Sequence, residues 1–180
     1  MTPLCELALK YGTNKCEEGY TPFYYAMFSL PRFKVKKVLE LGIGGPGKSG
    51  GPSKLGASLY MWEEFFPEAE ITCVDNDPAL LINAGRIRSF QADVFDPMTL
   101  TAVALNRGPF DVIIDDAVHL PEPQLSSALT LLPYLSPTGV YIIEDVANCP
   151  PEEIMVALPP EYRSATLKCA HWPIIIIARR

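Results

Sequence analysis

The stretch VLELGIGGPGKSGGPSK, residues 38–54, has the glycines and polar side chains from which proteins build nucleotide-binding turns. Three patterns fit it at once: the phosphate loop G-x-x-x-x-G-K-S, the dinucleotide turn G-x-G-x-x-G, and the acidic-x-G-x-G turn of proteins that bind S-adenosylmethionine (SAM). The positions that satisfy them are Glu40, Gly42, Gly44, Gly47, Lys48 and Ser49. Because the three patterns serve different chemistry, the surrounding sequence has to discriminate among them.

Glu40 and the residues after Ser49 favour the SAM turn. A phosphate loop needs a helix that begins at Lys48 and Ser49, so that its amides face the phosphates. Two glycines and a proline follow Ser49 directly and oppose a helix there. The dinucleotide turn needs its third glycine inside a helix, whereas Gly47 lies in the same Gly/Pro-rich segment. A carboxylate at Glu40 attracts cationic SAM and repels pyrophosphate, so the SAM turn is preferred and a phosphate-loop kinase stays as the alternative.

Apolar runs that end in acidic residues alternate with amphipathic stretches along the chain. The runs are KKVLELG, EITCVDND, IRSFQAD, FDVIIDDA and VYIIEDV, and the predicted helices are SKLGASLYMWEEFF, DPALLINAG, PMTLTAVALN and PEPQLSSALTLLPYL. Because both faces of the runs are apolar, we expect a parallel sheet covered by helices on both sides, an open α/β sandwich. After Val146, a short helix (PEEIMVAL) and the runs SATLKCA and PIIIIARR predict a terminal hairpin.

Acidic side chains stand at the ends of all the predicted parallel strands, where open sheets bind ligands. They are Glu40, Asp75, Asp93, Asp115, Asp116, Glu144 and Asp145. A single acid at a strand end is as often a helix cap or a solvated turn, but the whole set indicates a site. We expect Asp75 to accept hydrogen bonds from both ribose hydroxyls of the cofactor, and Gln91 and Asp93 to reach its adenine. The predicted cofactor-binding set is Glu40, Gly42, Gly44, Ser58, Asp75, Gln91, Asp93 and Asp115.

Length and composition indicate one folded domain with a small-molecule partner. With 180 residues, 48% of them hydrophobic, residues 1–180 suffice for one core, and we expect residues 1–33 to form a helical lid before a core domain of residues 34–180. The net charge of −6 argues against nucleic acid as a partner. Five cysteines without C-x-x-C spacing predict reduced thiols and a cytoplasmic location. No apolar run suits a signal peptide or a membrane span.

Several stretches together resemble one enzyme family, the metal-dependent SAM O-methyltransferases that tailor antibiotics and macrolide sugars. That family includes the mycinamicin and tylosin sugar methyltransferases and is related to the cephalosporin-biosynthesis methyltransferase group. The stretches that carry the likeness are KYGTNK, YTPFYY, VLELGIGG, GASLYMWEEFFPEAEITCVDNDP, RIRSFQAD, FDVIIDDAVH and LSPTGVYIIEDV. The likeness covers roughly Leu7 to Val146. It implies a Rossmann-like class I methyltransferase sandwich, with a seven-stranded, mostly parallel sheet whose last strand is antiparallel.

In the family that this chain resembles, a divalent cation, usually magnesium, holds the substrate hydroxyls beside the methyl group. The matching ligand positions are Asp116, Glu144 and Asp145, and hard cations prefer such oxygen ligands. His119 matches the family's proposed general base, and the ordinary pKa of histidine suits proton transfer near neutrality. Two roles stay open for Asp115: it could contact the amino end of SAM or the metal. The resemblance thus implies a SAM- and magnesium-dependent O-methyltransferase that acts on a hydroxyl of a sugar or other secondary metabolite.

The turn around His119 departs from the family pattern. Relatives often show D-D-G-S-H and a second histidine near the next helix, but this chain has Ala117 and Val118, then Pro121 and Pro123 without that histidine. This altered turn keeps open a catalytically degenerate methyltransferase fold that serves as a binding subunit, and the glycine pattern keeps open a kinase that uses GIGGPGKS. The expected partner is a small-molecule acceptor, with neither nucleic acid nor a membrane, and pairing into a homo-oligomer is an expectation by fold analogy.

Overall fold

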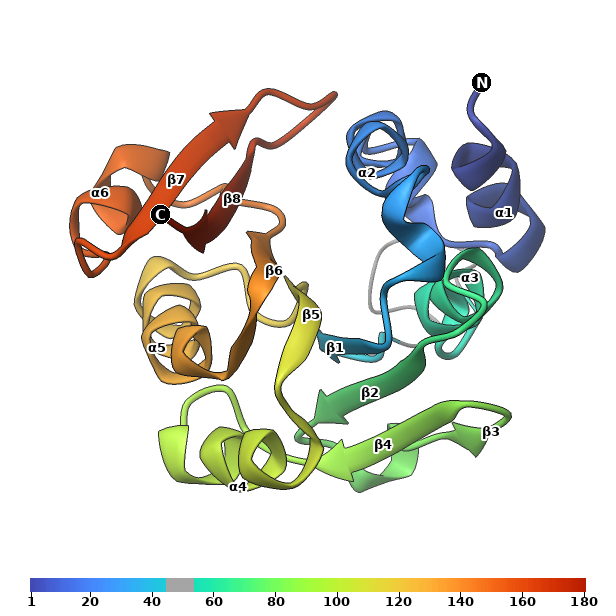
Figure 1. The fold of residues 1–180 in the computed structure, drawn as a ribbon, viewed down its shortest axis with the longest axis horizontal. Helices are drawn as coiled ribbons and strands as arrows, with labels where there is room; N and C mark the ends of the chain where they lie inside the picture. Colours follow the sequence, from blue (N-terminus) through green and yellow to red (C-terminus); the bar gives the residue numbers. More distant parts are fainter. Residues whose placement is uncertain (45–53) are drawn as a thin grey trace.

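A sheet of eight strands runs through the described part of the molecule, with helices on both of its faces (Figure 1). This computed structural model describes residues 1–44 and 54–180, so Gly47, Lys48 and Ser49 of the phosphate-loop pattern lie outside the described residues. The strands are β1 (Lys37–Leu41), β2 (Glu70–Asp75), β3 (Asn83–Ala84), β4 (Ile87–Gln91), β5 (Phe110–Asp115), β6 (Leu135–Ile143), β7 (Tyr162–Leu167) and β8 (Ile174–Arg179).

The strand order is β3-β4-β2-β1-β5-β6-β8-β7. Strands β4, β2, β1, β5 and β6 are parallel, whereas β8 runs antiparallel to β6, and β7 antiparallel to β8. The predicted sheet with a parallel centre and an antiparallel last strand is confirmed, and the two-residue β3 adds an eighth strand. The order reverses between β1 and β5, because the chain moves outward through β2 and β4 before it returns. Ligands of open sheets bind beyond the strand ends at such a switch point.

Six α-helices are found among the described residues. Helices α1 (Pro3–Tyr11), α2 (Thr21–Phe28) and α3 (Ala57–Phe65) lie on one side of the sheet, and α4 (Pro97–Arg107), α5 (Pro121–Leu131) and α6 (Pro151–Val156) on the other (Figure 1). Short 3-10 turns occur at η1 (Asn14–Cys16), η2 (Pro31–Phe33), η3 (Pro78–Leu80) and η4 (Leu132–Tyr134). The helices predicted after the first, third and fourth parallel strands are confirmed, with shifted ends.

The helix predicted for DPALLINAG, residues 77–85, is wrong. The chain makes the η3 turn, capped by the side chain of Asp77, and then forms β3, which pairs antiparallel with β4. Ser89 Oγ accepts a hydrogen bond from Ile82 N at 2.8 Å and donates to Ile82 O at 2.6 Å, which ties the segment to β4. Gly85, with a φ of +52°, makes the tight turn between the two strands. Pairing with β4 therefore outweighs the local helical spacing.

Each face of the sheet has its own apolar core. Trp62, Phe65 and Phe66 are at most 1% exposed on the α1–α3 side. The N-terminal segment, residues 1–33, belongs to this core, since Leu4 and Tyr24 are fully buried there. The opposite core is built on α4 and α5. The N-terminal segment therefore buries apolar side chains against the sheet, and its role as a lid stays a prediction.

The cysteines divide into one bonded pair and free thiols. Cys5 of α1 and Cys16 of η1 form a disulfide with their Cα atoms 5.1 Å apart. The prediction of reduced cysteines is therefore wrong for this pair, because the fold brings together two residues that no sequence motif connects. Cys73, Cys149 and Cys169 are free. In the ranges that the structure covers, no helix combines the length and apolar character needed to cross a membrane.

Candidate functional site

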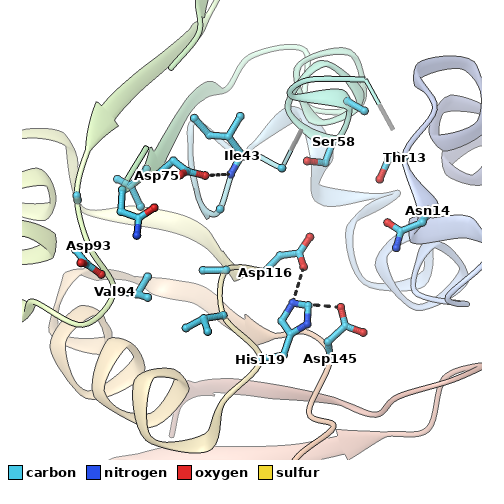
Figure 2. Close-up of a pocket in the computed structure, with 18 of the residues that line it drawn as sticks. Thr13, Asn14, Ile43, Ser58, Asp75, Asp93, Val94, Asp116, His119 and Asp145 are labelled. Atoms are coloured by element: carbon cyan, nitrogen blue, oxygen red, sulfur yellow. Dashed lines mark hydrogen bonds and ion pairs between the residues drawn. The ribbon is translucent and has the colours of Figure 1, made fainter. Parts of the chain in front are cut away.

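A cavity of about 350 Å³ lies beyond the carboxyl ends of the central strands (Figure 2). Its walls come from η1, from the first residues of α3, and from the turns that follow β1, β2, β4, β5 and β6. The side chains that give it polar groups include Thr13, Asn14, Ser58, Asp75, Asn76, Asp93, Asp116, His119 and Asp145. Cavities of this size hold cofactors and small molecules, and this one opens at the predicted switch point.

The turns after β1 and β2 form the end of the cavity that is predicted to bind the cofactor. Asp75 lines the cavity and accepts backbone hydrogen bonds from Ile43 (N to Oδ2, 3.1 Å) and Asp77 (N to Oδ1, 2.9 Å). A carboxylate offers about four acceptor positions, so both oxygens can still accept from ligand hydroxyls. Gly42 and Gly44 have φ values of +90° and +65°, in the region that favours glycine. The structure thus brings Asp75 and both predicted glycines to one wall of the cavity.

Glu40 and Ser58 form a deeper layer behind this wall. Glu40 is fully buried, Ser58 Oγ donates to its Oε2 at 3.0 Å, and Lys15 Nζ lies 3.3 Å from its Oε1. Burial raises the pKa of Glu40. Ser58 lines the cavity, but Glu40 faces a lysine of its own chain where the sequence predicted a cationic cofactor.

Gln91 and Asp115 also point away from the cavity. Gln91 Nε2 donates to Asn76 O at 3.3 Å, and its side chain lines a separate hollow beside α4. Asp115 is 2% exposed, accepts a hydrogen bond from Tyr141 OH at 3.1 Å, and has a pKa that burial raises to about 7. Of the residues predicted to reach the adenine, only Asp93 lines the cavity. Gln91 is the last residue of β4, whereas Asp93 lies in the turn that follows the strand, and this turn brings Asp93 to the cavity.

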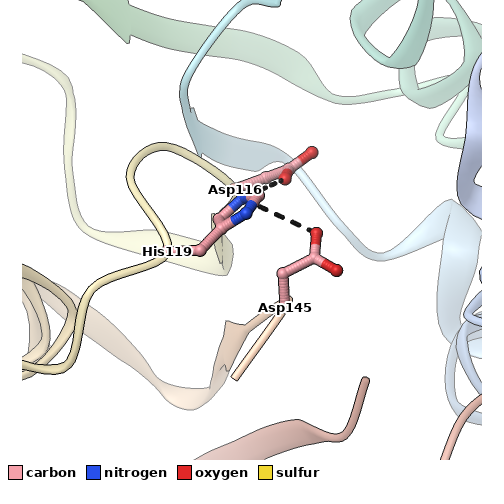
Figure 3. A group of neighbouring side chains, drawn as sticks. All are labelled: Asp116, His119 and Asp145. Atoms are coloured by element: carbon pink, nitrogen blue, oxygen red, sulfur yellow. Dashed lines mark hydrogen bonds and ion pairs between the residues drawn. The ribbon is translucent and has the colours of Figure 1, made fainter. Parts of the chain in front are cut away.

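Asp116, His119 and Asp145 meet in the part of the cavity away from Asp75 (Figures 2 and 3). His119 Nε2 lies 3.4 Å from Asp116 Oδ1 and 3.6 Å from Asp145 Oδ2, and one ligand atom of each residue falls within 4.8 Å of the others. The hydrogen bond with Asp116 raises the pKa of His119, although burial opposes this. Burial acts to raise the pKa of Asp116, but the charge of Lys15 and the contact with His119 hold it below its ordinary value. The cluster is therefore arranged to hold a cation or to orient a base.

Glu144 points away from this cluster. It is fully buried, and its two carboxylate oxygens accept hydrogen bonds from Lys15 Nζ and Tyr24 OH. Neighbouring residues of an extended chain face opposite sides, and Asp145, with a φ of +49°, turns the chain at this point. The structure thus brings Asp116 and Asp145 together, but not Glu144, which the family resemblance implied as their fellow metal ligand.

The N-terminal segment holds these acids from beneath, a role that the sequence did not reveal. Tyr20 OH donates to Asp145 Oδ1 at 2.6 Å, while Tyr24 and Lys15 contact Glu144. Burial raises the pKa values of both tyrosines. Tyr20 and Tyr24 are both buried. The contacts with the acids span 120 to 129 residues, a distance over which no local pattern carries a signal.

The cavity is chemically suited to a divalent cation and to a cationic cofactor. Asp116 and Asp145 offer oxygen ligands of the kind that hard cations prefer, with the imidazole of His119 beside them. Asp75 and Asp93 add further acidic groups to the lining. Lys54 also lines the cavity, but the four aspartates outnumber it, and a cleft in which one sign of charge predominates concentrates ligands of the opposite sign. The site therefore favours a cation over a polyphosphate.

Comparison with curated proteins finds sugar O-methyltransferases of antibiotic biosynthesis, although no protein-family model matches the chain. The 8-demethyl-8-(2-methoxy-alpha-L-rhamnosyl)-tetracenomycin-C 3'-O-methyltransferase of Streptomyces olivaceus is 39% identical over 151 residues, 82% of this chain and 38% of that protein. Mycinamicin VI 2''-O-methyltransferase of Micromonospora griseorubida is 37% identical over 145 residues, 79% of this chain and 36% of that protein. The chain thus spans little more than a third of these relatives' length.

Among solved structures, the MycE methyltransferase from the mycinamycin biosynthetic pathway matches 99% of this chain and 55% of its own. It was solved in complex with Mg, SAH and mycinamycin VI, and it superposes with a TM-score of 0.79 at 28% identity. The predicted resemblance and fold class are both confirmed. This chain has the Rossmann-like fold of class I methyltransferases and resembles the sugar O-methyltransferases that tailor antibiotics.

Proposed function

We propose that this chain forms the catalytic site of a SAM-dependent O-methyltransferase that methylates a hydroxyl of a sugar-bearing small molecule with the help of magnesium. The observation that carries this proposal is one cavity with Asp75 at one end and the Asp116–His119–Asp145 cluster at the other. A methyl transfer between two bound molecules needs both of them in one space, since holding them together supplies much of the rate enhancement. The named activities of the relatives support a sugar hydroxyl as the acceptor.

SAM is assigned to the end of the cavity formed by Asp75. The oxygens of Asp75 are fixed by backbone amides, so they are oriented to accept hydrogen bonds from the ribose hydroxyls. Asp93 lines the neighbouring wall, where the adenine is expected. The acidic lining attracts the cationic SAM and repels the polyphosphate of ATP, which weighs against the kinase alternative.

The divalent cation is assigned to Asp116 and Asp145. When bound, magnesium lowers the pKa of the acceptor hydroxyl and orients it. The two carboxylates come from the turns after β5 and β6 and offer the oxygen ligands that magnesium prefers. Glu144, the third ligand by resemblance, would have to leave Lys15 and Tyr24 to reach such an ion.

We assign His119 the role of general base, which takes the proton of the acceptor hydroxyl at Nε2. The reaction forms a bond between the hydroxyl oxygen and the methyl carbon and breaks the bond from that carbon to sulfur, which keeps the electron pair. The hydroxyl proton passes to Nε2, and the nearby carboxylates of Asp116 and Asp145 stabilise the resulting imidazolium. Only neutral imidazole accepts a proton, so turnover should rise with pH as His119 loses its own.

The first test is calorimetric titration of the EDTA-treated protein with SAM, S-adenosylhomocysteine and ATP, each with and without magnesium. We expect the first two to bind and ATP to give no signal. Asp75→Asn should weaken SAM binding about tenfold or more, because it removes a charged acceptor. Glu153→Gln, at an exposed position of α6, is the matched control and should bind SAM as the wild type does.

The second test is turnover with a glycosylated acceptor. Methylation should require magnesium and be lost in Asp116→Asn and Asp145→Asn while SAM still binds. Unchanged turnover in both variants would remove the proposed role of the cation. Magnesium-dependent ATP binding with SAM silent would favour the kinase, and Lys48→Ala would then abolish it. Weak or absent SAM binding without any effect of the cation would favour the catalytically degenerate binding subunit.

A further inference from the structure

Lys15 lies beneath the cavity as a buried cation among three carboxylates. Its side chain is 1% exposed, and Nζ lies 2.7 Å from Asp116 Oδ2 and 3.3 Å from Glu40 Oε1, and hydrogen bonds to Glu144 Oε2. These acids come from the ends of β1, β5 and β6. One ammonium group therefore joins the turn assigned to SAM with the turns assigned to the acceptor.

The surrounding chain holds Lys15 in this position. Its carbonyl accepts a hydrogen bond from Tyr20 N at 3.0 Å, and the next residue, Cys16, is bonded to Cys5 of α1. An ammonium group without partners is costly to bury, so the three carboxylates stabilise it there. Lys15 is thus a fixed positive charge.

This charge acts on a carboxylate that the proposed cation also uses. Asp116 faces Lys15 with Oδ2, at 2.7 Å, and turns Oδ1 toward His119. Lys15 therefore sets the orientation of Asp116 and neutralises part of its charge. A divalent ion held by Asp116 and Asp145 would be attracted by both carboxylates but repelled by the ammonium group of Lys15.

We propose that Lys15 is a positioning residue that serves as the site's built-in counter-ion. In the cation-free protein it holds Asp116 and Glu144 in place, and it weakens the binding of the divalent ion. This inference rests on the proposed function, because it assumes that a divalent ion binds at Asp116 and Asp145. A purely structural lysine would support the fold without opposing the ion.

The test is a titration of the EDTA-treated protein with Mn²⁺, followed by the electron paramagnetic resonance of free Mn²⁺. Lys15→Gln keeps a hydrogen-bond donor but removes the charge, and we expect its Mn²⁺ dissociation constant to fall about tenfold. Lys15→Arg keeps the charge and should bind Mn²⁺ as the wild type does. Lys10→Gln removes a lysine that is 55% exposed and ion-paired with Glu64, so it is the matched surface control and should not change the titration.

The second readout is thermal unfolding with and without Mn²⁺. Lys15→Gln should lower the midpoint in EDTA and recover most of the loss in saturating Mn²⁺, because the ion replaces the missing charge. If this variant folds only with Mn²⁺ present, the inference is supported, and if Mn²⁺ does not rescue its folding, the inference fails.

The outcomes separate this inference from the proposed function. Wild-type protein that binds Mn²⁺, with Lys15→Gln binding it equally or more weakly, overturns the counter-ion role and leaves the cation site intact. Wild-type protein that binds no Mn²⁺ while Lys15→Gln does bind it supports the counter-ion role. Absence of Mn²⁺ binding in both proteins overturns the cation site and the counter-ion role together.

Discussion

Gly42 lies where the end of β1 meets the turn that carries Asp116. Its φ is +90°, and a Cβ atom added to it would lie 2.4 Å from the carbonyl oxygen of Asp116 and 3.0 Å from Cα of Ala117. Asp116 N donates to Leu41 O at 3.0 Å, and Gly42 N donates to Val74 O at 2.9 Å, so neither segment is free to retreat. Gly42→Ala therefore has to displace the backbone of a proposed cation ligand.

The expected cost has two parts. A side chain in the left-handed region costs about 1–2 kcal/mol, and forcing a methyl group against packed backbone adds about 1–3 kcal/mol. Gly12 has a φ of +81° and no atom of the described residues within 4 Å of an added Cβ, so Gly12→Ala carries only the first part. We expect Gly42→Ala to lower the free energy of unfolding by about 1–3 kcal/mol more than Gly12→Ala.

Urea unfolding of the EDTA-treated variants, followed by far-ultraviolet circular dichroism, measures this difference through the shift of the midpoint. The Mn²⁺ titration provides an independent check, because a displaced Asp116 should weaken cation binding in Gly42→Ala but not in Gly12→Ala. Equal losses of stability in the two variants, with equal Mn²⁺ affinity, would refute the contact between Gly42 and the Asp116 turn as the reason for glycine at this position.

Two further predictions concern the buried groups around the site. In EDTA-treated wild-type protein, Asp115 should contribute a fall in the free energy of unfolding as the pH rises from its ordinary pKa of 3.8 to about 7, because folded Asp115 keeps a proton that the unfolded chain releases. Asp115→Asn should abolish this contribution when the free energy of unfolding is measured by urea unfolding at several pH values. An unchanged dependence on pH would contradict the raised pKa of Asp115. Tyr20→Phe removes the donor to Asp145 Oδ1 and should cost about 1–3 kcal/mol in the same assay. Tyr25→Phe, on the partly exposed side of α2, is its control and should change stability by less than about 0.5 kcal/mol.

Much of the fold follows from local patterns. An apolar run with acids at its end is a parallel strand that stops at the ligand edge, and each of the five predicted runs corresponds to such a strand. The helix predicted for residues 77–85 was wrong because pairing with β4, a tertiary contact, outweighed local spacing. No local pattern indicated that the buried Tyr20 and Tyr24 are partners of the acids.

The sequence by itself determined which residues are available at the switch point: Asp75, Asp93, Asp116, His119 and Asp145 each line the cavity as their positions after strands predicted. Only the tertiary structure decided which of the acidic residues turn inward. Glu40, Asp115 and Glu144 are buried behind the cavity wall, because consecutive side chains alternate in direction. The partner that makes burial tolerable for two of them, Lys15, lies 25 and 129 residues away in the chain. Packing of the N-terminal segment brings that charge beneath the site, and no local pattern encodes contacts over such separations.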